Sequence, residues 1–558
     1  MPSTFVTIFV SFAIASSTII YKTWLTRRSP LPPGPPRKWL VGNMFDFPTS
    51  RPWLTFRDWC NEHGGLVFID LPFKPIVVIG SVQVARDLLD DRSRIYSDRP
   101  YSTMMEILDW SWAFFTMPYN SEWRANRKYF HDHFRRSAIP SYHSILLQET
   151  HVALKRLLEA PNESHQHLRN FPGSSIMRVV YGVRSAAQLR EYVDLAEHAV
   201  DSIRRTLIPG AFLAELISFL KYIPPWMPGG MARAFAAQYR PVVQQLRDRP
   251  FDEVKQAMAE GKATPSIVYS LIKDMQGEGG YMTKEQVQIA RGIAATAYAA
   301  ASDTACTFQV YYHKAGDYSH MHWQTTATLL FFVLAMAMYP EAQRKAQEEL
   351  ERVVGPSRLP DFNDTKSLVY VHALMLETLR WRPIAPTGAP HALSEDDVYK
   401  GYHIPKGSLI IANSWAMLHD PVDYPEPDTF NPERFMTKDG EIDTSVRDPT
   451  TIAFGFGRRA CAGKEFSLSS LKIFMASMLH VYDIQPGVGE DGHPVVLSAE
   501  GSDEAIMYAL FDISASVFVI SDAGSGQLSY DISSIHQASF ESSGASHPRH
   551  RAYGGLSE

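Results

Sequence analysis

The residues best suited to chemistry in this chain surround a cysteine in a glycine-rich stretch. Cys461 lies in the run Phe-Gly-Phe-Gly-Arg-Arg-Ala-Cys-Ala-Gly, which spans residues 454–463. Apolar residues at near-helical spacing predict a helix over 464–480, and the positive end of its dipole favours a thiolate at Cys461. A thiolate is a strong ligand for haem iron. The alternative is an inert cysteine buried in a turn, because free cysteines are often core residues.

The loop carries a longer pattern, Phe-x-x-Gly-x-Arg-x-Cys-x-Gly, formed by Phe454, Gly457, Arg459, Cys461 and Gly463. This pattern resembles the haem-binding loop of the cytochrome P-450 family, in which the cysteine is the axial iron ligand. The resemblance implies that Cys461 is the metal ligand and that Arg459 holds a haem propionate. It also places Phe454 and Gly463 in the cofactor site.

Two further stretches resemble propionate contacts of that family. Trp123 and Arg127 are four residues apart on a predicted helix and therefore share one face. They resemble the family's Trp-x-x-x-Arg helix, in which both side chains hold a haem propionate. A guanidinium suits that role, since it binds a carboxylate through a two-pronged, charge-assisted contact. His391, which follows Pro390 ahead of a predicted sheet, has a family-like position for another propionate contact.

An alanine-rich helix is predicted over 286–304, and it ends in Ala-Ala-Ser-Asp-Thr. It resembles the family's oxygen-binding helix, with Ala301 where the family often has glycine. The resemblance implies that Asp303 and Thr304 deliver protons for the heterolytic cleavage of dioxygen.

Three ionic residues complete the family pattern. Glu377 and Arg380 are spaced i, i+3 on a helix predicted over 367–382, and Arg434 follows in Pro-Glu-Arg-Phe. They resemble the buried network that lies behind the family's cysteine loop, so a structural role is expected. All three should be required, because a half-satisfied buried ion pair is costly.

Composition narrows the classes of partner and compartment. The chain of 558 residues has a net charge of −6, so it lacks the excess of positive charge that is typical of nucleic-acid-binding proteins. Nucleic acid is therefore not an expected partner. Three cysteines argue against a disulfide framework and for a reducing compartment.

The uncharged apolar run 5–21, followed by Lys22, Arg27 and Arg28, predicts a single-pass anchor with the bulk of the chain in the cytosol. The alternative is a cleaved signal peptide, because residues 13–15 resemble a cleavage site.

Two apolar stretches bear on substrate access. Residues 101–119 are rich in Met, Trp and Phe, and they resemble the roof of the family's substrate pocket, which suggests an apolar substrate. Plain core packing explains them equally well. Residues 209–230 are apolar and broken by prolines, which is typical either of a segment at a membrane surface or of a buried loop.

The pattern is interrupted at residues 305–326, which are polar and aperiodic although the family has one continuous helix there. We interpret the interruption as a retained intron, because removing codons 306–326 would leave a serine at the junction and restore the helix. A metal site at His320 and His322 is an alternative. The chain departs again after Pro486, and residues 501–558 are predicted to be disordered. A frameshift, a mis-called last exon or a genuinely altered tail explains them.

The resemblance covers residues 30–486 and implies a mainly α fold with small β-sheets, the cytochrome P-450 fold, behind an N-terminal transmembrane helix. The predicted regions are an anchor over 1–29, a haem domain over 30–500 with an atypical insert at 305–326, and the tail over 501–558. The implied protein is a microsomal, fungal haem-thiolate monooxygenase in the endoplasmic reticulum membrane, with haem b as its cofactor. It would act on an apolar small molecule with NADPH electrons delivered by NADPH–cytochrome P-450 reductase.

Two other functions stay open. The insert and the tail favour a haem-binding but catalytically impaired product of a mis-spliced gene. A haem-thiolate isomerase or peroxygenase would need no reductase, and the intact Asp303–Thr304 pair argues against it.

Overall fold

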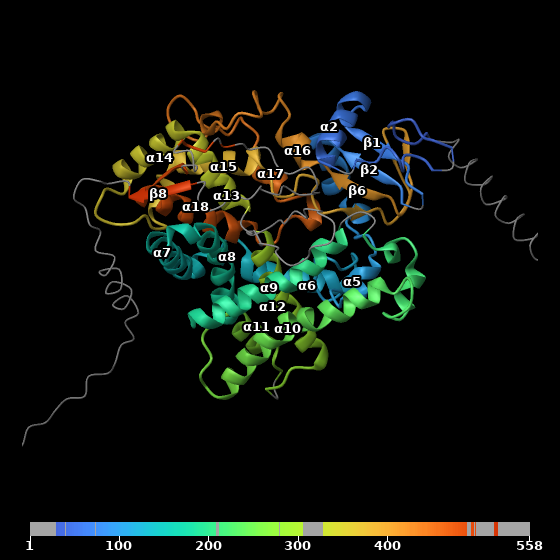
Figure 1. The fold of residues 1–558 in the computed structure, drawn as a ribbon, viewed down its shortest axis with the longest axis horizontal. Helices are drawn as coiled ribbons and strands as arrows, with labels where there is room; N and C mark the ends of the chain where they lie inside the picture. Colours follow the sequence, from blue (N-terminus) through green and yellow to red (C-terminus); the bar gives the residue numbers. More distant parts are fainter. Residues whose placement is uncertain are drawn as a thin grey trace, which may run out of the picture.

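The computed structural model describes residues 30–39, 41–48, 50–72, 74–207, 211–277, 280–304, 327–487, 493–495, 497 and 518–522. Within these residues the chain is mainly helical with small β-sheets, which confirms the predicted fold class (Figure 1). The run 5–21, the insert 305–326 and most of the tail 501–558 lie outside the described residues. In the part of the chain that is described, no helix has both the length and the apolar character needed to cross a bilayer.

Helices make up most of the fold. The longer ones are α2 (Pro52–His63), α6 (Ser121–Phe134), α7 (His143–Glu159), α8 (Ser164–Tyr181), α9 (Ala186–Leu207), α10 (Met231–Ala259), α11 (Ile267–Met275), α12 (Lys284–Thr304), α13 (Ala327–Met338), α14 (Pro340–Val353), α15 (Val369–Trp381) and α18 (Lys464–Val481). The short ones are α3 (Val82–Ala85), α4 (Ser93–Tyr96), α5 (Thr103–Ile107), α16 (Ser414–Leu418) and α17 (Thr450–Ala453), together with the single π-turn η1 (Arg86–Asp91). The 3₁₀ turns are η2 (Ile139–Tyr142), η3 (Pro161–Glu163), η4 (Leu213–Glu215), η5 (Ser218–Tyr222), η6 (Asp364–Lys366), η7 (Pro432–Phe435) and η8 (Gly457–Arg459).

In the part of the chain that the structure describes, the strands form three small sheets. They are β1 (Leu66–Ile69), β2 (Ile76–Ile79), β3 (His391–Ala392), β4 (Asp397–Tyr399), β5 (Tyr402–Ile404), β6 (Leu409–Ala412), β7 (Tyr482–Pro486) and β8 (Phe518–Asp522). The largest sheet has the order β1-β2-β6-β3, and it lies with α2 at the upper right of Figure 1. In it β2 pairs in parallel with β6, with Ile76 opposite Leu409, so strands more than three hundred residues apart are neighbours. The other sheets are the antiparallel pairs β4-β5 and β7-β8.

The tail prediction needs one correction. Strand β8 lies within residues 501–558, where the sequence predicts disorder, yet it pairs antiparallel with β7 from Tyr482↔Asp522 to Pro486↔Phe518. The pairing satisfies the backbone groups of both strands, which a free strand would leave to solvent.

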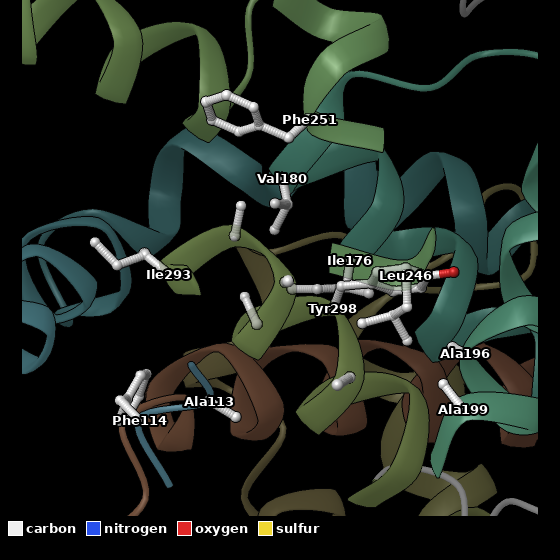
Figure 2. Close-up of a cluster of buried hydrophobic side chains, with 14 of the residues drawn as sticks. Ala113, Phe114, Ile176, Val180, Ala196, Ala199, Leu246, Phe251, Ile293 and Tyr298 are labelled. Atoms are coloured by element: carbon white, nitrogen blue, oxygen red, sulfur yellow. The ribbon is translucent and has the colours of Figure 1, made fainter. Parts of the chain in front are cut away.

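Helix α12 is the centre of the main core. Its buried face is largely alanine, which lets the surrounding helices approach closely, and α8, α9, α10 and α11 pack against it. Figure 2 shows side chains of α8, α9, α10 and α12 meeting in one cluster, with Ile293 and Tyr298 contributed by α12 and Val180 by α8. A second core cluster joins α13, α14, α15 and α18. The proline-rich segment at the start of the described chain is tied to the first sheet, since Phe68 N–H donates to the Pro33 carbonyl at 2.8 Å.

Candidate functional site

The cysteine loop is a tight turn between α17 and α18. The Cys461 N–H donates to the Phe454 carbonyl at 2.7 Å, which closes the loop. Gly457 has a φ of 56° and a Cβ there would lie 1.9 Å from the Leu89 carbonyl oxygen of η1, so no other residue fits. The Gly457 N–H also donates to Asp90 Oδ1 at 2.6 Å. The loop is therefore held from one side by the π-turn η1.

The electrostatics of the Cys461 thiol differ from the sequence prediction. As predicted, Cys461 lies just before the helix α18. Its thiol lines the cavity, so a ligand in the cavity can reach it. Burial nevertheless raises the pKa of Cys461, although the Gly463 N–H, Arg127 and Lys464 oppose the shift. In the protein alone, burial thus favours the thiol, which opposes the predicted preference for the thiolate. A bound cation would reverse the balance, since a metal-coordinating thiol is deprotonated.

A cavity opens in front of Cys461, and four elements or loops supply most of its wall. They are α6, α12, the cysteine loop and the start of α18. The described residues that line the cavity are Arg99, Phe114, Phe115, Trp123, Arg127, Phe130, Phe134, Ile176, Thr296, Ala297, Ala300, Ala301, Arg459, Ala460, Cys461, Ala462, Gly463, Phe466 and Ser467. The wall is therefore mostly aromatic and small apolar side chains, with guanidiniums and one thiol among them.

Three arginines line this cavity. None of them forms an ion pair within 4.0 Å among the described residues, although the Asp98 carboxylate interacts electrostatically with Arg99 and Arg459. Arg127 donates to the Ala460 carbonyl at 2.7 Å, Arg459 to the Met117 carbonyl at 2.7 Å, and Arg99 to the Ala389 carbonyl at 2.9 Å. Burial lowers the pKa of Arg99 to about 10. Burial and the neighbouring Arg99 lower the pKa of Arg459 to about 9. The cavity therefore holds a surplus of positive charge.

This donor set fits a flat, apolar cofactor that carries two carboxylates and takes a sulfur ligand, as haem b does. The guanidiniums supply more charge-assisted donors than two carboxylates need. The Nε1 of Trp123 is buried without a partner in the described residues, and the Arg459 guanidinium lies 4.4 Å from the Trp123 ring centroid. A Cβ on Gly463 would meet no atom within 4 Å, so packing within the protein does not explain why this residue is a glycine. A cofactor lying in the cavity would explain it, because the cofactor would occupy the space beside Gly463.

Two predicted cofactor residues lie off the cavity wall. His391 is buried and its Nδ1 lies 2.8 Å from the Tyr96 carbonyl oxygen. Burial, together with Arg99, lowers the pKa of His391 to about 3, so the imidazole is neutral beside the arginines. Phe454 contributes its carbonyl to the loop, while the Lys464 ammonium lies 5.8 Å from its ring.

The predicted proton-delivery pair is at the end of α12. The helix backbone extends to Thr304 as predicted, and Ala300 and Ala301 line the cavity one turn earlier. The side chains of Asp303 and Thr304 lie outside those that the structure describes. Their roles therefore stay a prediction.

Behind the loop, Glu377, Arg380 and Arg434 form one buried ionic network. Arg380 grips Glu377 with Nε and Nη2 at 2.7 and 2.8 Å, and Arg434 Nε donates to Glu377 Oε1 at 3.1 Å. The Glu377 and Arg380 side chains are 0% exposed and Arg434 is 7% exposed. The network joins α15 to η7, and α15 also packs against α17 and α18, the two helices that flank the cysteine loop.

Sequence reasoning missed three polar residues of the wall, Arg99, Thr296 and Ser467. Arg99 stands in no family-like motif, and it reaches the cavity because its segment packs beside the strand β3, almost three hundred residues later in the chain. Thr296 lies within the helix predicted over 286–304, four residues before Ala300. That spacing could have indicated that the two residues share one face of the helix.

Comparison with known proteins agrees with this geometry. The family model described as Cytochrome P-450 matches residues 32–307 and 323–496. Cytochrome P-450 monooxygenase 98 of Postia placenta is 37% identical over 493 residues, which cover 88% of this chain and 90% of that protein. Cytochrome P-450 monooxygenase ple1 of Rhodocybe pseudopiperita is 38% identical, with 83% of this chain and 85% of that protein covered.

A relative with a named substrate is more distant. Tryptamine 4-monooxygenase of Psilocybe cyanescens is 31% identical, with 88% of this chain and 94% of that protein covered. The family model matches most of the chain, the relatives are similar over most of their length, and the cavity has donors that suit haem. The chain therefore belongs to the cytochrome P-450 monooxygenase family.

Proposed function

We propose that this monooxygenase inserts one atom of dioxygen into an apolar small molecule, with electrons that NADPH–cytochrome P-450 reductase draws from NADPH. The observation that carries the proposal is the cavity, in which Cys461 faces an apolar wall beside three guanidiniums that form no ion pair with a carboxylate among the described residues. When bound, haem b supplies the activation of dioxygen.

Each residue has a distinct task in this proposal. Cys461 holds the iron, and its loop is kept in place by the Phe454 carbonyl and by Asp90. Arg99, Arg127 and Arg459 would bind the propionates, with Trp123 Nε1 as an additional donor and His391 behind them. Asp303 and Thr304 would deliver protons from the end of α12. Phe114, Phe115 and the alanines of α12 exclude water and offer apolar contact to the substrate.

A basic stripe on α6 supports the reductase as the electron donor. Arg124, Lys128 and His131 are exposed at the spacing i, i+4 and i+7, which lines them up along one face of the helix, and the exposed Arg135 follows at its C-terminal cap. The neighbouring face of α6 carries Trp123 and Phe130 to the cavity wall. Positive charge so close to the cofactor site suits a partner with an acidic docking surface, because complementary potentials steer and orient the encounter.

We further propose that residues 5–21 anchor the protein in the endoplasmic reticulum membrane with its catalytic domain in the cytosol. The apolar run and its basic C-terminal flank support the anchor. A second apolar surface supports contact with the bilayer, namely eight exposed side chains between residues 213 and 231. They are Leu213, Leu216, Ile217, Phe219, Tyr222, Trp226, Met227 and Met231.

The full-length protein is therefore expected to stay in the membrane pellet when microsomes are washed with alkaline carbonate. A variant that lacks residues 1–29 serves as the control and should be released at least in part, because the surface at 213–231 binds without spanning the bilayer. Release of the full-length chain would contradict the anchor. A mature N-terminus that begins after Ala15 would instead favour the cleaved signal peptide.

A second candidate function is a haem-binding protein with impaired turnover. One observation favours it: the family match stops at residue 307 and resumes at 323, inside the interruption 305–326. The helices on either side, α12 and α13, belong to different core clusters, although both contact α8. In this second candidate function, the polar insert directly after Thr304 displaces the end of α12. Displacing the proton-delivery pair slightly is enough to cost about 10²-fold in rate.

Deleting residues 306–326, with serine at the junction, is expected to raise product formation per haem by about 10²-fold. Both chains would be incubated with the reductase, NADPH, isotopically labelled dioxygen and a panel of polycyclic hydrocarbons, and mass spectrometry would detect products with one labelled oxygen. Samples without reductase are the control and should form none. Product made with peroxide but never with the reductase would favour the peroxygenase instead. Equal activity of the two chains would identify the insert as a tolerated loop.

A further inference from the structure

We propose that Thr296 sets the substrate preference of this cavity, by pairing its hydroxyl with one polar group on an otherwise apolar substrate skeleton. The inference rests on the proposed function, since it concerns the same cavity, and it narrows the substrate class from apolar molecules to apolar molecules with a single hydrogen-bonding handle. Hydroxyl and carbonyl groups share this chemistry.

The hydroxyl of Thr296 is exceptional among the buried threonines. Thr296 lines the cavity and is 1% exposed, yet its Oγ1 has no hydrogen-bond partner among the described residues. Buried polar groups are normally paired, and a threonine inside a helix usually bonds the carbonyl four residues earlier. Thr150 in α7 does so with the Leu146 carbonyl at 2.8 Å, and Thr378 in α15 with the Leu374 carbonyl at 2.9 Å. The fold therefore leaves the Thr296 hydroxyl available to a ligand.

The surroundings of Thr296 make this hydroxyl selective. On the part of α12 that lines the cavity, the other described residues are alanines, which leave room for a substrate and offer it no hydrogen bond. The guanidiniums of the wall are assigned to the cofactor's carboxylates. Ser467, at the start of α18 beside the cysteine loop, is the other hydroxyl-bearing residue among the described lining residues. A site with few polar groups in apolar surroundings fixes the orientation of its ligand. A site built to bond a hydroxyl also discriminates against the analogue that lacks it, because the buried group is then unpaired.

Paired probes test this selectivity by binding rather than by turnover. The haem-loaded enzyme would be titrated with bornane and borneol, cedrane and cedrol, and androstane and androstanol, with the shift of the haem absorption as the signal. For at least one pair we expect the alcohol to bind more tightly than the hydrocarbon. Thr296→Val should lower the affinity for that alcohol by about tenfold and change the affinity for the matching hydrocarbon by less than about twofold. Thr296→Ser, which keeps the hydroxyl, should retain the preference.

Thermal unfolding of the purified, substrate-free protein provides a readout that needs no turnover. Thr296→Val should leave its melting temperature unchanged or raise it, because the substitution replaces an unpaired buried hydroxyl by a methyl group. The matched control Thr150→Val removes a hydroxyl that is already paired and should lower the melting temperature. If Thr296→Val instead lowers the melting temperature, as Thr150→Val should, the proposal is overturned. That result would show that the Thr296 hydroxyl has a hydrogen-bond partner within the protein.

The binding arm can also overturn it. The proposal fails if no alcohol binds better than its hydrocarbon, or if Thr296→Val weakens both members of a pair equally. The reduced, carbon-monoxide-treated wild-type protein is examined first. If its spectrum lacks the band of a thiolate-bound haem, the proposed function fails, and the unfolding comparison still tests whether the Thr296 hydroxyl is free.

Discussion

Replacing Cys461 with histidine is expected to abolish the red-shifted Soret band that a thiolate-ligated haem gives in the reduced, carbon-monoxide-treated protein. Cys461 supplies the sulfur of the cavity wall, and the imidazole of histidine binds iron without the negative charge of a thiolate. Monooxygenation should be lost with the band, because the thiolate's electron donation favours cleavage of the O–O bond. Absorption spectra of the two purified proteins at equal haem content make the comparison.

The chain offers a matched control in Cys60, a second described free cysteine. Cys60 is buried in α2, where burial raises the pKa of its thiol to about 12. Cys60→Ala should keep the band, since this cysteine packs against the first sheet and takes no part in the cavity. A band that survives in Cys461→His, or that disappears in Cys60→Ala, would show that the ligand is misassigned.

The second large effect is expected from Glu377→Gln. Glu377 is the one carboxylate between Arg380 and Arg434 in their buried network, and it also accepts the Asn431 N–H at 2.8 Å. Glutamine keeps the shape of the side chain but leaves two buried guanidiniums without a negative charge. Breaking a buried pair in this way costs about 3–5 kcal/mol of folding free energy. The melting temperature and the haem retained after purification should both fall.

Glu341→Gln is the control for this charge change. Glu341 pairs with Arg344 on the exposed face of α14, where solvent screens the pair, so its loss should leave the melting temperature unchanged. Glu377→Gln unfolding at the wild-type temperature would show that the network contributes little to stability. A large effect of Glu341→Gln would show that the response is not specific to burial.

The sequence predicted those parts of the site that depend on local spacing. The Cys461 loop, the Trp123–Arg127 pair and the Glu377–Arg380 pair are each encoded within a few residues, and the structure brings the first two to one cavity. Helices with strong apolar periodicity were predicted to within a few residues, as the match between the predicted 464–480 and α18 illustrates.

Features that depend on distant contacts were not predictable. Arg99 reaches the cavity because its segment bridges to the strand β3, where Ala392 N–H donates to the Asp98 carbonyl at 2.9 Å, and no local pattern encodes that pairing. The raised pKa of Cys461 has the same origin, since the burial that raises it comes from segments far apart in the chain. The unpaired hydroxyl of Thr296 is likewise visible only once the neighbours of α12 are in place.

The surplus of positive charge in the cavity has a consequence for the abundance of this protein in a cell. Arg99 and Arg459 repel one another and are shielded from water, so the folded chain bears an electrostatic cost until carboxylates enter. A dianion that binds the folded chain and not the unfolded one shifts the folding equilibrium by mass action. Chains that have captured their prosthetic group should therefore outlive those that have not, because proteases degrade the unfolded fraction. Cofactor supply, as well as synthesis of the polypeptide, then sets the steady-state level of the enzyme.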